Sequence, residues 1–317
     1  MRRWLGAPWL GPAMAVAAVY LLFALLAPDT FPRTVNALTM ARQTVVVAIA
    51  AIGMTLIMIQ GGIDLSVGST VALTTVVVAR ALDGGVGPLT ALALGVALGA
   101  LVGSLNGVLI ASLDLLPFVV TLGSMSALRG LAKGLANEQK IDADPRGLDA
   151  LMALPGGKQG GFLLPSGVWI ALLLGLLVAA FIAYTRPGRH VVAVGSSVAT
   201  ARLAGVRVGR ITVMVYAMAG ALAGLAGVLE FSTLTVGDPT DSIGLELEVI
   251  AAVVIGGGSL SGGRGSVAGA LFGALLLTEI KTGCTHVGFP NWVQEILTGA
   301  IILIAMTLDR VRAKRSA

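Results

Sequence analysis

Long apolar runs, which follow one another along almost the whole chain, limit its fold more than any other feature. Each run is close to the length that an α-helix needs to cross the roughly 30 Å hydrocarbon core of a membrane. The runs cover residues 9–27, 43–60, 66–82, 89–113, 117–135, 166–184, 211–231, 245–260, 265–281 and 291–308. Charged residues make up only 12% of the chain, about half their share in a soluble domain, so lipid must cover most of its surface. The sequence therefore predicts an all-α, polytopic membrane bundle of about ten transmembrane helices in one domain, residues 1–317.

Basic residues indicate which side of the membrane each end of the bundle faces. Segment 185–210 is rich in arginine and has no acidic residue, and the tail 309–317 carries Arg310, Arg312, Lys314 and Arg315. Because Lys and Arg are retained on the cytoplasmic side, we expect this segment and both termini to be cytoplasmic, as an even number of spans requires. The loop 136–165 is then periplasmic. Membrane topology also accounts for the net charge of +5, so we expect no nucleic-acid partner.

The N-terminus resembles a signal peptide, because Arg2 and Arg3 precede an apolar run. That run is long for the apolar part of a signal peptide, so we expect it to remain as an uncleaved first span.

A short internal similarity indicates two related halves. Residues 61–69 read GGIDLSVGS and residues 257–263 read GGSLSGG, and each segment follows an apolar run. If the halves, roughly 1–135 and 166–317, have five spans each, they enter the membrane in opposite orientations, which is the inverted-repeat plan of many transporters. The alternative is a chance similarity between two glycine-rich segments.

Glycines four residues apart predict faces where helices pack closely, because glycine lets two backbones approach each other in a membrane. These glycines are Gly95, Gly99, Gly103 and Gly107 in one run and Gly265, Gly269 and Gly273 in another. We interpret both rows as helix-packing faces. The alternative is that they slide past their neighbours during a conformational change.

The segment after Gln60 is the most informative interruption of an apolar run. Gly61 and Gly62 end a helix, and Asp64 and Ser66 follow. A short oxygen acceptor at this position can cap the next helix by binding its free backbone N–H groups. The alternative is that Asp64 faces a solute path, where it would bind hydroxyl groups or a gating partner.

Further residues are candidates for the same path. Asn106 lies inside an apolar run, where a buried amide needs a partner, so it either pairs with a neighbouring helix or lines the path. Phe118 and Thr121 follow Pro117 and are candidates for a constriction. Glu279 lies near the end of its run, so we expect it to reach the lipid headgroups. Our candidate path residues are therefore Asp64, Ser66, Asn106, Phe118 and Thr121.

The sequence lacks the motifs of an enzyme that acts alone. It has no phosphate-binding loop, and its two histidines, His190 and His286, are far apart and have no ligand-spaced cysteines. We therefore expect no catalytic residues, no metal and no cofactor, and any ATP hydrolysis must come from another chain. An ion-coupled secondary transporter of a small polar solute is the alternative function. It needs ionisable residues at mid-membrane depth, and the centres of the runs are almost free of them.

Four motifs in order along the chain resemble those of a known family. They are AIGMTL at 51–56 leading into GGIDLSVG at 61–68, PFVVTLG at 117–123, Gly188-Arg189 with AVG at 193–195, and VIGGGSLSGGRG at 254–265. Over about residues 36–308 the chain is similar to the ribose-type permeases of bacterial ABC importers.

The resemblance implies a permease subunit of the bacterial inner membrane that translocates a monosaccharide or similar small polar solute by alternating access. It implies three partners: a second permease, identical or related, a cytoplasmic ABC ATPase that binds ATP and docks on 185–210, and a periplasmic sugar-binding protein. The residues expected at the ATPase interface are Gly188, Arg189, Gly195, Ala201 and Gly205. Ser196 and Ser197 depart from the Gly-Asn that relatives usually have after Gly195, which affects the detailed fit to an ATPase.

Overall fold

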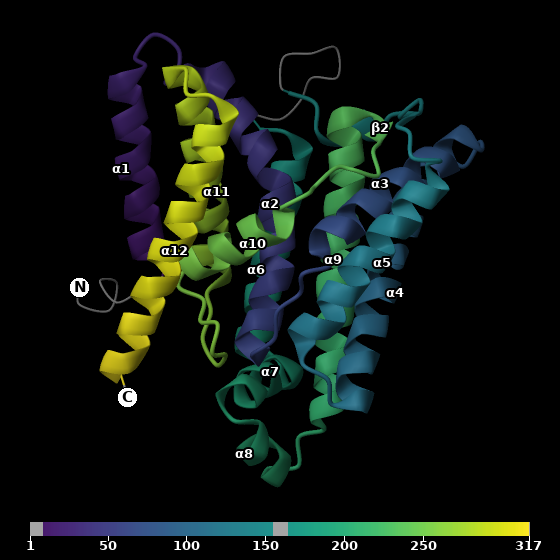
Figure 1. Ribbon diagram of the computed structural model, residues 1–317, viewed down its shortest axis with the longest axis vertical. Coiled ribbons are helices and arrows are strands. Elements are labelled where there is room, and N and C mark those ends of the chain that lie inside the picture. Colours follow the sequence, from purple (N-terminus) through teal and green to yellow (C-terminus); the bar gives the residue numbers. More distant parts are fainter. Residues whose placement is uncertain (1–8, 155–163, 317) are drawn as a thin grey trace.

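A computed structural model describes residues 9–154 and 164–316 of the chain (Figure 1). The described part is an elongated bundle of helices, as the apolar runs predict, together with one two-stranded ribbon. Arg2, Arg3 and residues 155–163 of the expected periplasmic loop lie outside the described residues.

Ten helices of the described chain follow the ten apolar runs, and two short helices fall in the arginine-rich segment. The helices that follow the runs are α1 (Leu10–Leu26), α2 (Thr34–Gln60), α3 (Val67–Asp83), α4 (Pro88–Leu113), α5 (Pro117–Leu135), α6 (Ser166–Tyr184), α9 (Val208–Leu234), α10 (Leu245–Ile255), α11 (Val267–Val287) and α12 (Asn291–Ser316). The two short helices are α7 (Arg186–Ser196) and α8 (Val198–Leu203). The loops contain β1 (Ile141–Asp142), a 3-10 turn (Leu148–Leu151) and β2 (Val236–Gly237).

Helix length separates full spans from shorter elements. By length and composition, α2, α4, α6, α9 and α11 could each cross a membrane. The 11 residues of α10 cannot, because they extend only about 16 Å at 1.5 Å per residue. The predicted span 245–260 is therefore a half-helix, which ends at Gly256 and is followed by Gly257 with a φ of +87°.

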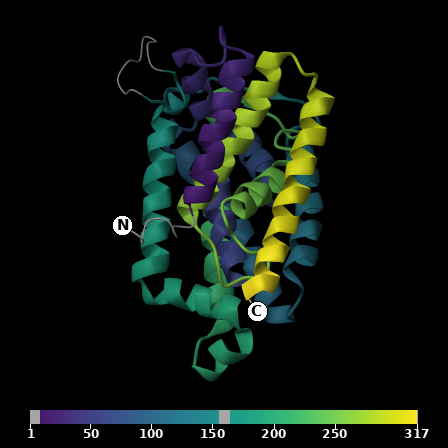
Figure 2. The same cartoon turned by 90° about the vertical axis from the view of Figure 1, so that its left-hand side faces the viewer.

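The helices of the two halves run in opposite directions (Figures 1 and 2). Helix α2 runs toward the end of the bundle that carries α7 and α8, whereas α9 starts at that end and runs back. Both α3 and α10 begin inside the bundle, where Gly68 lies against Leu245 and the backbone of Ser242. Opposite helix directions around two such interrupted helices are what an inverted repeat requires.

The two glycine-rich segments that pointed to the repeat are not equivalent positions in it. The N–H group of Gly263 donates to the carbonyl of Ile59 at 2.8 Å, and Gly262 lies against Gly61. Gly61 of the first segment thus meets Gly262 of the second at the end of α2, whereas an inverted repeat places equivalent residues at opposite ends. For this pair, the alternative of chance similarity fits the structure.

Helices α4 and α9 pack with their backbones in contact. The glycines of α4 that face α9 are Gly95, Gly99, Gly103 and Gly107. A Cβ atom on Gly99 would overlap the carbonyl oxygen of Gly220, and one on Gly103 would overlap that of Tyr216. Only glycine allows this approach, which joins a helix of one half to a helix of the other.

The second glycine row is shorter than predicted. Gly269 and Gly273 of α11 lie against the backbone of α10, at Gly256 and Ala252. Gly265 precedes the first residue of α11 and instead contacts the side chain of Ile59. It therefore lies in the loop before α11 and is not part of the helix face.

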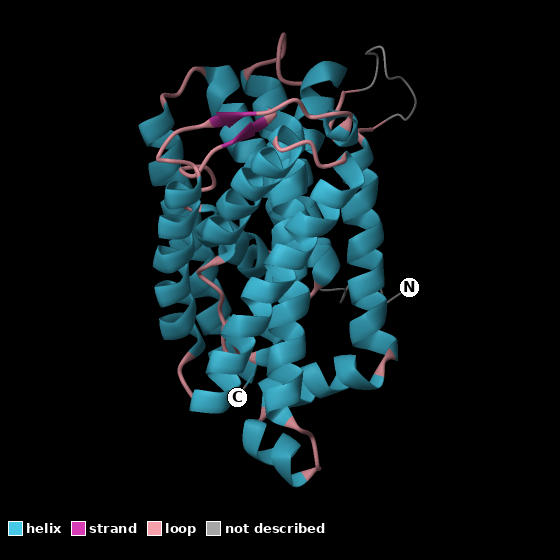
Figure 3. Ribbon diagram, turned by 90° about the vertical axis from the view of Figure 1, so that its right-hand side faces the viewer, coloured by secondary structure: helices cyan, strands magenta, loops and turns pink. Residues whose placement is uncertain are grey.

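A small ribbon joins the halves at the end opposite α7 and α8 (Figure 3). Strands β1 and β2 pair antiparallel, and the Lys140 ammonium lies 2.9 Å from the Asp238 carboxylate. The guanidinium of Arg129 in α5 donates to the carbonyls of Pro239 and Asp241, at 3.0 and 2.6 Å. These bonds fix the turns between β2 and α10, through which the chain returns into the bundle.

Candidate solute path and coupling segment

The break between α2 and α3 depends on glycine and on a tyrosine from α9. Gly61 follows α2 with a φ of +91°, a left-handed conformation that favours glycine. The Tyr216 hydroxyl lies where a Cβ on Gly62 would be, and it donates to the Ile63 carbonyl at 3.1 Å. The interrupted backbone therefore has a protein partner, as it must inside a membrane.

Asp64 and Ser66 form a local turn before α3. One carboxylate oxygen of Asp64 accepts both the Ser66 N–H, at 2.8 Å, and the Ser66 hydroxyl, at 2.6 Å. Ser66 is the N-cap residue of α3, but its side chain does not bind the free N–H groups of that helix. Asp64 is 6% exposed and Ser66 is fully buried. The Asp64 carboxylate thus closes a turn onto Ser66, the residue that precedes α3, and contact between Asp64 and a solute stays a prediction.

Asn106 and Ser124 extend the turn across two helices. The Asn106 amide donates to the Ser66 hydroxyl at 3.0 Å and accepts from the Ser124 hydroxyl at 2.5 Å. The side chains of Asp64, Ser66, Asn106 and Ser124 are called the buried polar cluster below. Beside it, the Thr121 hydroxyl lies 3.4 Å from the Ile63 carbonyl. The structure thus brings four of the five candidate path residues together and adds Ser124.

Phe118 is the candidate that the structure separates from the others. Its side chain is 47% exposed on α5, whereas Thr121 is fully buried. An exposed aromatic side chain on a membrane helix faces lipid or another subunit, and the place of Phe118 in a constriction stays a prediction.

A second polar region, which the sequence analysis missed, lies on α10 and α11. The Lys281 ammonium is 2.5 Å from the Glu248 carboxylate. The Lys281 side chain is 40% exposed and that of Glu248 is 23% exposed. Each residue lies near the end of a predicted run, at the start of 245–260 and at the end of 265–281. The sequence therefore shows one charged residue at the end of each run. It does not show that the two residues pair, because the pairing depends on how the helices pack.

The sequence analysis expects Glu279 to reach the lipid headgroups, but the structure buries its side chain. It is 3% exposed, and its Oε2 atom has no hydrogen-bonding partner. The expectation was wrong because α11 continues to Val287, well beyond the predicted run. Glu279 is also not part of a metal centre, since residues 9–154 and 164–316 contain no group of three His, Cys, Asp or Glu side chains that could hold a metal ion.

Helices α7 and α8 lie across one end of the bundle (Figure 1). Each starts at a side-chain cap: the Thr185 hydroxyl accepts the Gly188 N–H at 3.1 Å, and the Ser197 hydroxyl accepts the Thr200 N–H at 3.2 Å. Such caps bind N–H groups that have no partner within the helix. The arginine-rich segment is thus ordered as two short helices, and it is not a featureless solvated loop.

The residues predicted to face an ATPase fall into two groups. Those packed against the bundle are Gly188, Gly195 and Ala201, and those exposed are Arg189 and Gly205. A Cβ on Gly195 would overlap the Ile59 carbonyl, so this contact fixes α7 to the end of α2. Leu203 of α8, which the sequence analysis did not single out, is 90% exposed. It is an exposed apolar side chain at this end of the bundle, together with Val198 of the same helix.

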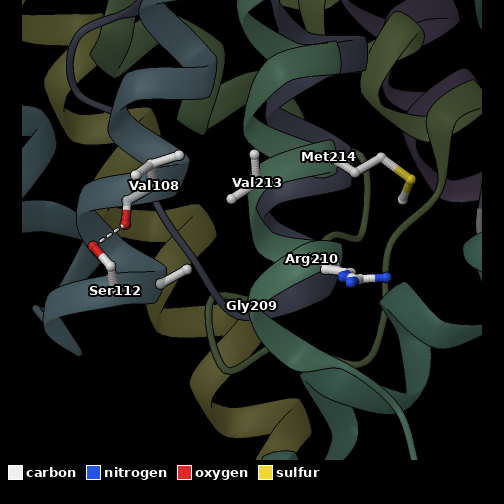
Figure 4. Close-up of a pocket in the computed structure, with 7 residues that line it drawn as sticks. Val108, Ser112, Gly209, Arg210, Val213 and Met214 are labelled. Carbon is white, nitrogen blue, oxygen red and sulfur yellow. Dashed lines mark hydrogen bonds between the residues drawn. The ribbon is translucent and has the colours of Figure 1, made fainter.

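A groove of about 550 Å³ lies between α4 and α9 (Figure 4). The Ser112 hydroxyl at its edge donates to the Val108 carbonyl of its own helix at 2.6 Å. Arg210 lies on α9, away from α4 in this view. The rest of the lining is Ala111, Gly209, Val213 and Met214. A mainly apolar groove gives a polar solute little to bind, so we do not place the path there.

Comparison with known proteins identifies relatives along nearly the whole chain. A sequence model of the family described as "Branched-chain amino acid transport system / permease component" matches residues 36–306. The ribose import permease protein RbsC of Escherichia coli (strain K12) is 37% identical, over 97% of this chain and 96% of that protein. RbsC of Bacillus subtilis (strain 168) is 36% identical, over 96% and 93% of the two chains. The L-arabinose ABC transporter permease protein AraH of Azospirillum brasilense is 34% identical, over 95% and 87%. No solved structure matches the chain.

These matches confirm the resemblance that the four motifs indicated. The family model covers most of the chain, and the relatives align with it from end to end. The fold agrees, since the described residues form an all-α bundle whose long helices could cross a membrane. The chain therefore belongs to the family of membrane permease subunits that includes the ribose and L-arabinose permeases of bacterial ABC importers.

Proposed function

We propose that this permease moves a monosaccharide of the size of ribose or arabinose across the bacterial inner membrane. The observation that carries the proposal is its end-to-end similarity to relatives named for ribose and L-arabinose transport. The family description mentions branched-chain amino acids, but these relatives favour a sugar.

Three partners complete the proposed importer. An ABC ATPase binds ATP and docks on α7 and α8, where Leu203 and Arg189 are exposed. A periplasmic sugar-binding protein docks at the opposite end, beside β1 and β2. A second permease chain, identical or related, lies alongside this one. Helix α12 ends on the side that carries α7 and α8 (Figure 2), so we assign the C-terminus to the cytoplasm, together with the N-terminus.

In this mechanism the chain changes shape but carries out no chemistry. ATP binding to the partner moves α7, and the contact of Gly195 with Ile59 passes that movement to α2. Gly263, whose N–H donates to Ile59, passes it to the loop before α11. Both halves are thus connected to one docking segment, which suits alternating access.

Uptake by purified complexes in proteoliposomes tests the function. We expect uptake of D-ribose or L-arabinose that requires the ATPase, ATP and the binding protein. Uptake without the ATPase, driven by a proton or sodium gradient, would instead support the ion-coupled secondary transporter.

A matched pair of variants tests the docking segment. Leu203→Asp places a charge on α8, and we expect recovery of the ATPase with the permease to fall by about tenfold. Leu89→Asp is the control, because Leu89 is 80% exposed but lies at the start of α4, at the other end of the bundle. Equal ATPase recovery with both variants would place the docking surface elsewhere.

A further inference from the structure

The Glu248–Lys281 ion pair lies within the membrane part of the bundle but is not sealed inside it. Glu248 is in the first turn of α10, a helix that begins inside the bundle, and Lys281 is on the membrane-spanning α11. Both side chains are partly exposed, by 23% and 40%. Charged groups at such depth face protein or water, because lipid cannot solvate them.

Two cavities open on either side of this pair. One, of about 460 Å³, lies between α2, α10 and α11, and its polar lining residues besides the pair are Asn36, Thr39, Gln43, Thr278, Thr282, Thr285 and His286. The other, of about 540 Å³, lies between α10, α11 and α12, and its polar lining residues are Asn291, Gln294, Glu295 and Thr298. Glu248 and Lys281 line both cavities. Each volume lies in the range of small-molecule sites, about 300–1,000 Å³.

Several of the lining side chains contact one another across the cavity walls. The Gln294 amide donates to the Thr285 hydroxyl at 3.2 Å, and the His286 ring nitrogen lies 3.1 Å from the Asn36 amide oxygen. These contacts do not use every donor and acceptor position of the lining amides and hydroxyls, so the others are available to water or a solute. A lining of this kind holds water in the resting protein, since unpaired amides and charges are costly in a dry cavity.

We propose that the Glu248–Lys281 pair and the amides and hydroxyls of both cavities form a hydrated contact site for an uncharged polyhydroxy solute. The carboxylate accepts from solute hydroxyls and the ammonium donates to them, which suits adjacent hydroxyls of a sugar. The pair is neutral as a whole, which suits an uncharged solute, and the Glu295 carboxylate in one cavity disfavours an anion. This inference rests on the proposed function and assigns part of its solute path to residues outside the buried polar cluster.

Cysteine labelling tests the hydration independently of transport. In a Cys284→Ser background, which removes the chain's single cysteine, Thr282→Cys and Gln294→Cys each place a thiol in one cavity. We expect a charged, membrane-impermeant methanethiosulfonate reagent to modify both at least about tenfold faster than Leu176→Cys. Leu176 is the matched control because it is 68% exposed on α6, where it faces lipid. Equal, slow labelling of all three would overturn the hydrated site.

Charge variants in the complete importer test solute contact. We expect Glu248→Gln and Lys281→Gln each to lower the rate of ATP-dependent D-ribose or L-arabinose uptake by about tenfold, with normal folded yield and ATPase recovery. The exchanged pair, Glu248→Lys with Lys281→Glu, keeps the ion pair but reverses its donors and acceptors, so we expect uptake to stay low.

Two results would contradict the proposed contact site, and both can be told apart from a result that contradicts the proposed transport function. Wild-type uptake rates in the single variants, or full recovery in the exchanged pair, would show that the pair is structural only. If the wild-type importer moved neither sugar, the function would be wrong, while the labelling rates would still report whether the cavities are hydrated.

Discussion

The buried polar cluster and the Glu248–Lys281 pair are two polar regions of one membrane bundle that differ in access to water. Asp64, Ser66 and Asn106 are 6%, 0% and 2% exposed, and the cluster's hydrogen bonds run from side chain to side chain inside the protein. Glu248 and Lys281 are partly exposed and line two polar cavities. Both regions adjoin an interrupted helix, so the break alone does not decide the role of its polar groups.

We infer from the difference that, in a bundle of this kind, access to water separates structural from functional polarity. A sealed group must have its partners within the protein, and the cluster therefore holds the broken α2–α3 connection in place. A group beside a cavity can exchange water for solute hydroxyls. Loss of a hydrogen bond in the cluster should accordingly lower the stability of the protein, whereas loss of the Asp64 charge should have little effect. At the ion pair, loss of charge should lower solute uptake.

The largest effect is expected where α4, which carries Asn106, packs on α9. Gly103→Leu places a side chain on the Tyr216 carbonyl, so the helices must separate and Asn106 moves with α4. We expect a loss of more than about 3 kcal/mol, seen as a collapse of the monodisperse peak in size-exclusion chromatography in detergent.

Gly123→Leu on α5 is the control for this variant, because no atom lies within 4 Å of a Cβ at Gly123. If Gly103→Leu gave the same folded yield as Gly123→Leu, the backbone contact of α4 with α9 would not hold the cluster in place.

Next in size is the removal of the central amide of the cluster. Asn106→Leu leaves the hydroxyls of Ser66 and Ser124 without one partner each, so we expect a loss of about 1–2 kcal/mol in the free energy of unfolding. Thermal unfolding in detergent measures it. Ser112→Ala on the same helix is the control, since its hydroxyl bonds only its own helix backbone. An Asn106→Leu protein as stable as Ser112→Ala would show that the cluster adds nothing.

A smaller effect on stability is expected when a carboxylate of either region is replaced by the amide of the same shape. The amide oxygen of Asp64→Asn can still accept from the Ser66 N–H and hydroxyl, so we expect stability to change by less than about 1 kcal/mol and uptake to stay within about twofold of wild type. Glu248→Gln is the matched change in the open region, and there uptake should fall. Loss of uptake in Asp64→Asn with normal folding would reverse the assignment and return Asp64 to the path.

The sequence predicted the helices better than the grouping of polar residues. Asp64, Asn106 and Thr121 could be chosen because each is a polar residue in or beside an apolar run, and the structure brings them together. Lys281 and Glu248 could not be paired, because they lie 33 residues apart on a half-helix that hydropathy presents as a full span. Gly265 was misplaced for a similar reason, since four-residue spacing does not show where a helix starts. Pairing across helices depends on tertiary packing, which no local pattern contains.

The smallest effect should come from the pair of Lys140 and Asp238 beside the ribbon, whose lysine is in contact with water. Partial burial raises the pKa of Asp238, but hydrogen bonds from Thr240 and Lys140 outweigh it and hold the pKa below the usual value of 3.8. The pair therefore stabilises the fold above pH 3.8, and its contribution is lost as the pH falls through the lower folded-state value. Because Lys140 is 69% exposed, we expect Lys140→Ala to lower the melting temperature at pH 7 by about 1 °C or less. The shift should shrink further at high salt. If this change were as damaging as Asn106→Leu, access to water would not be the variable that ranks the polar contacts of this protein.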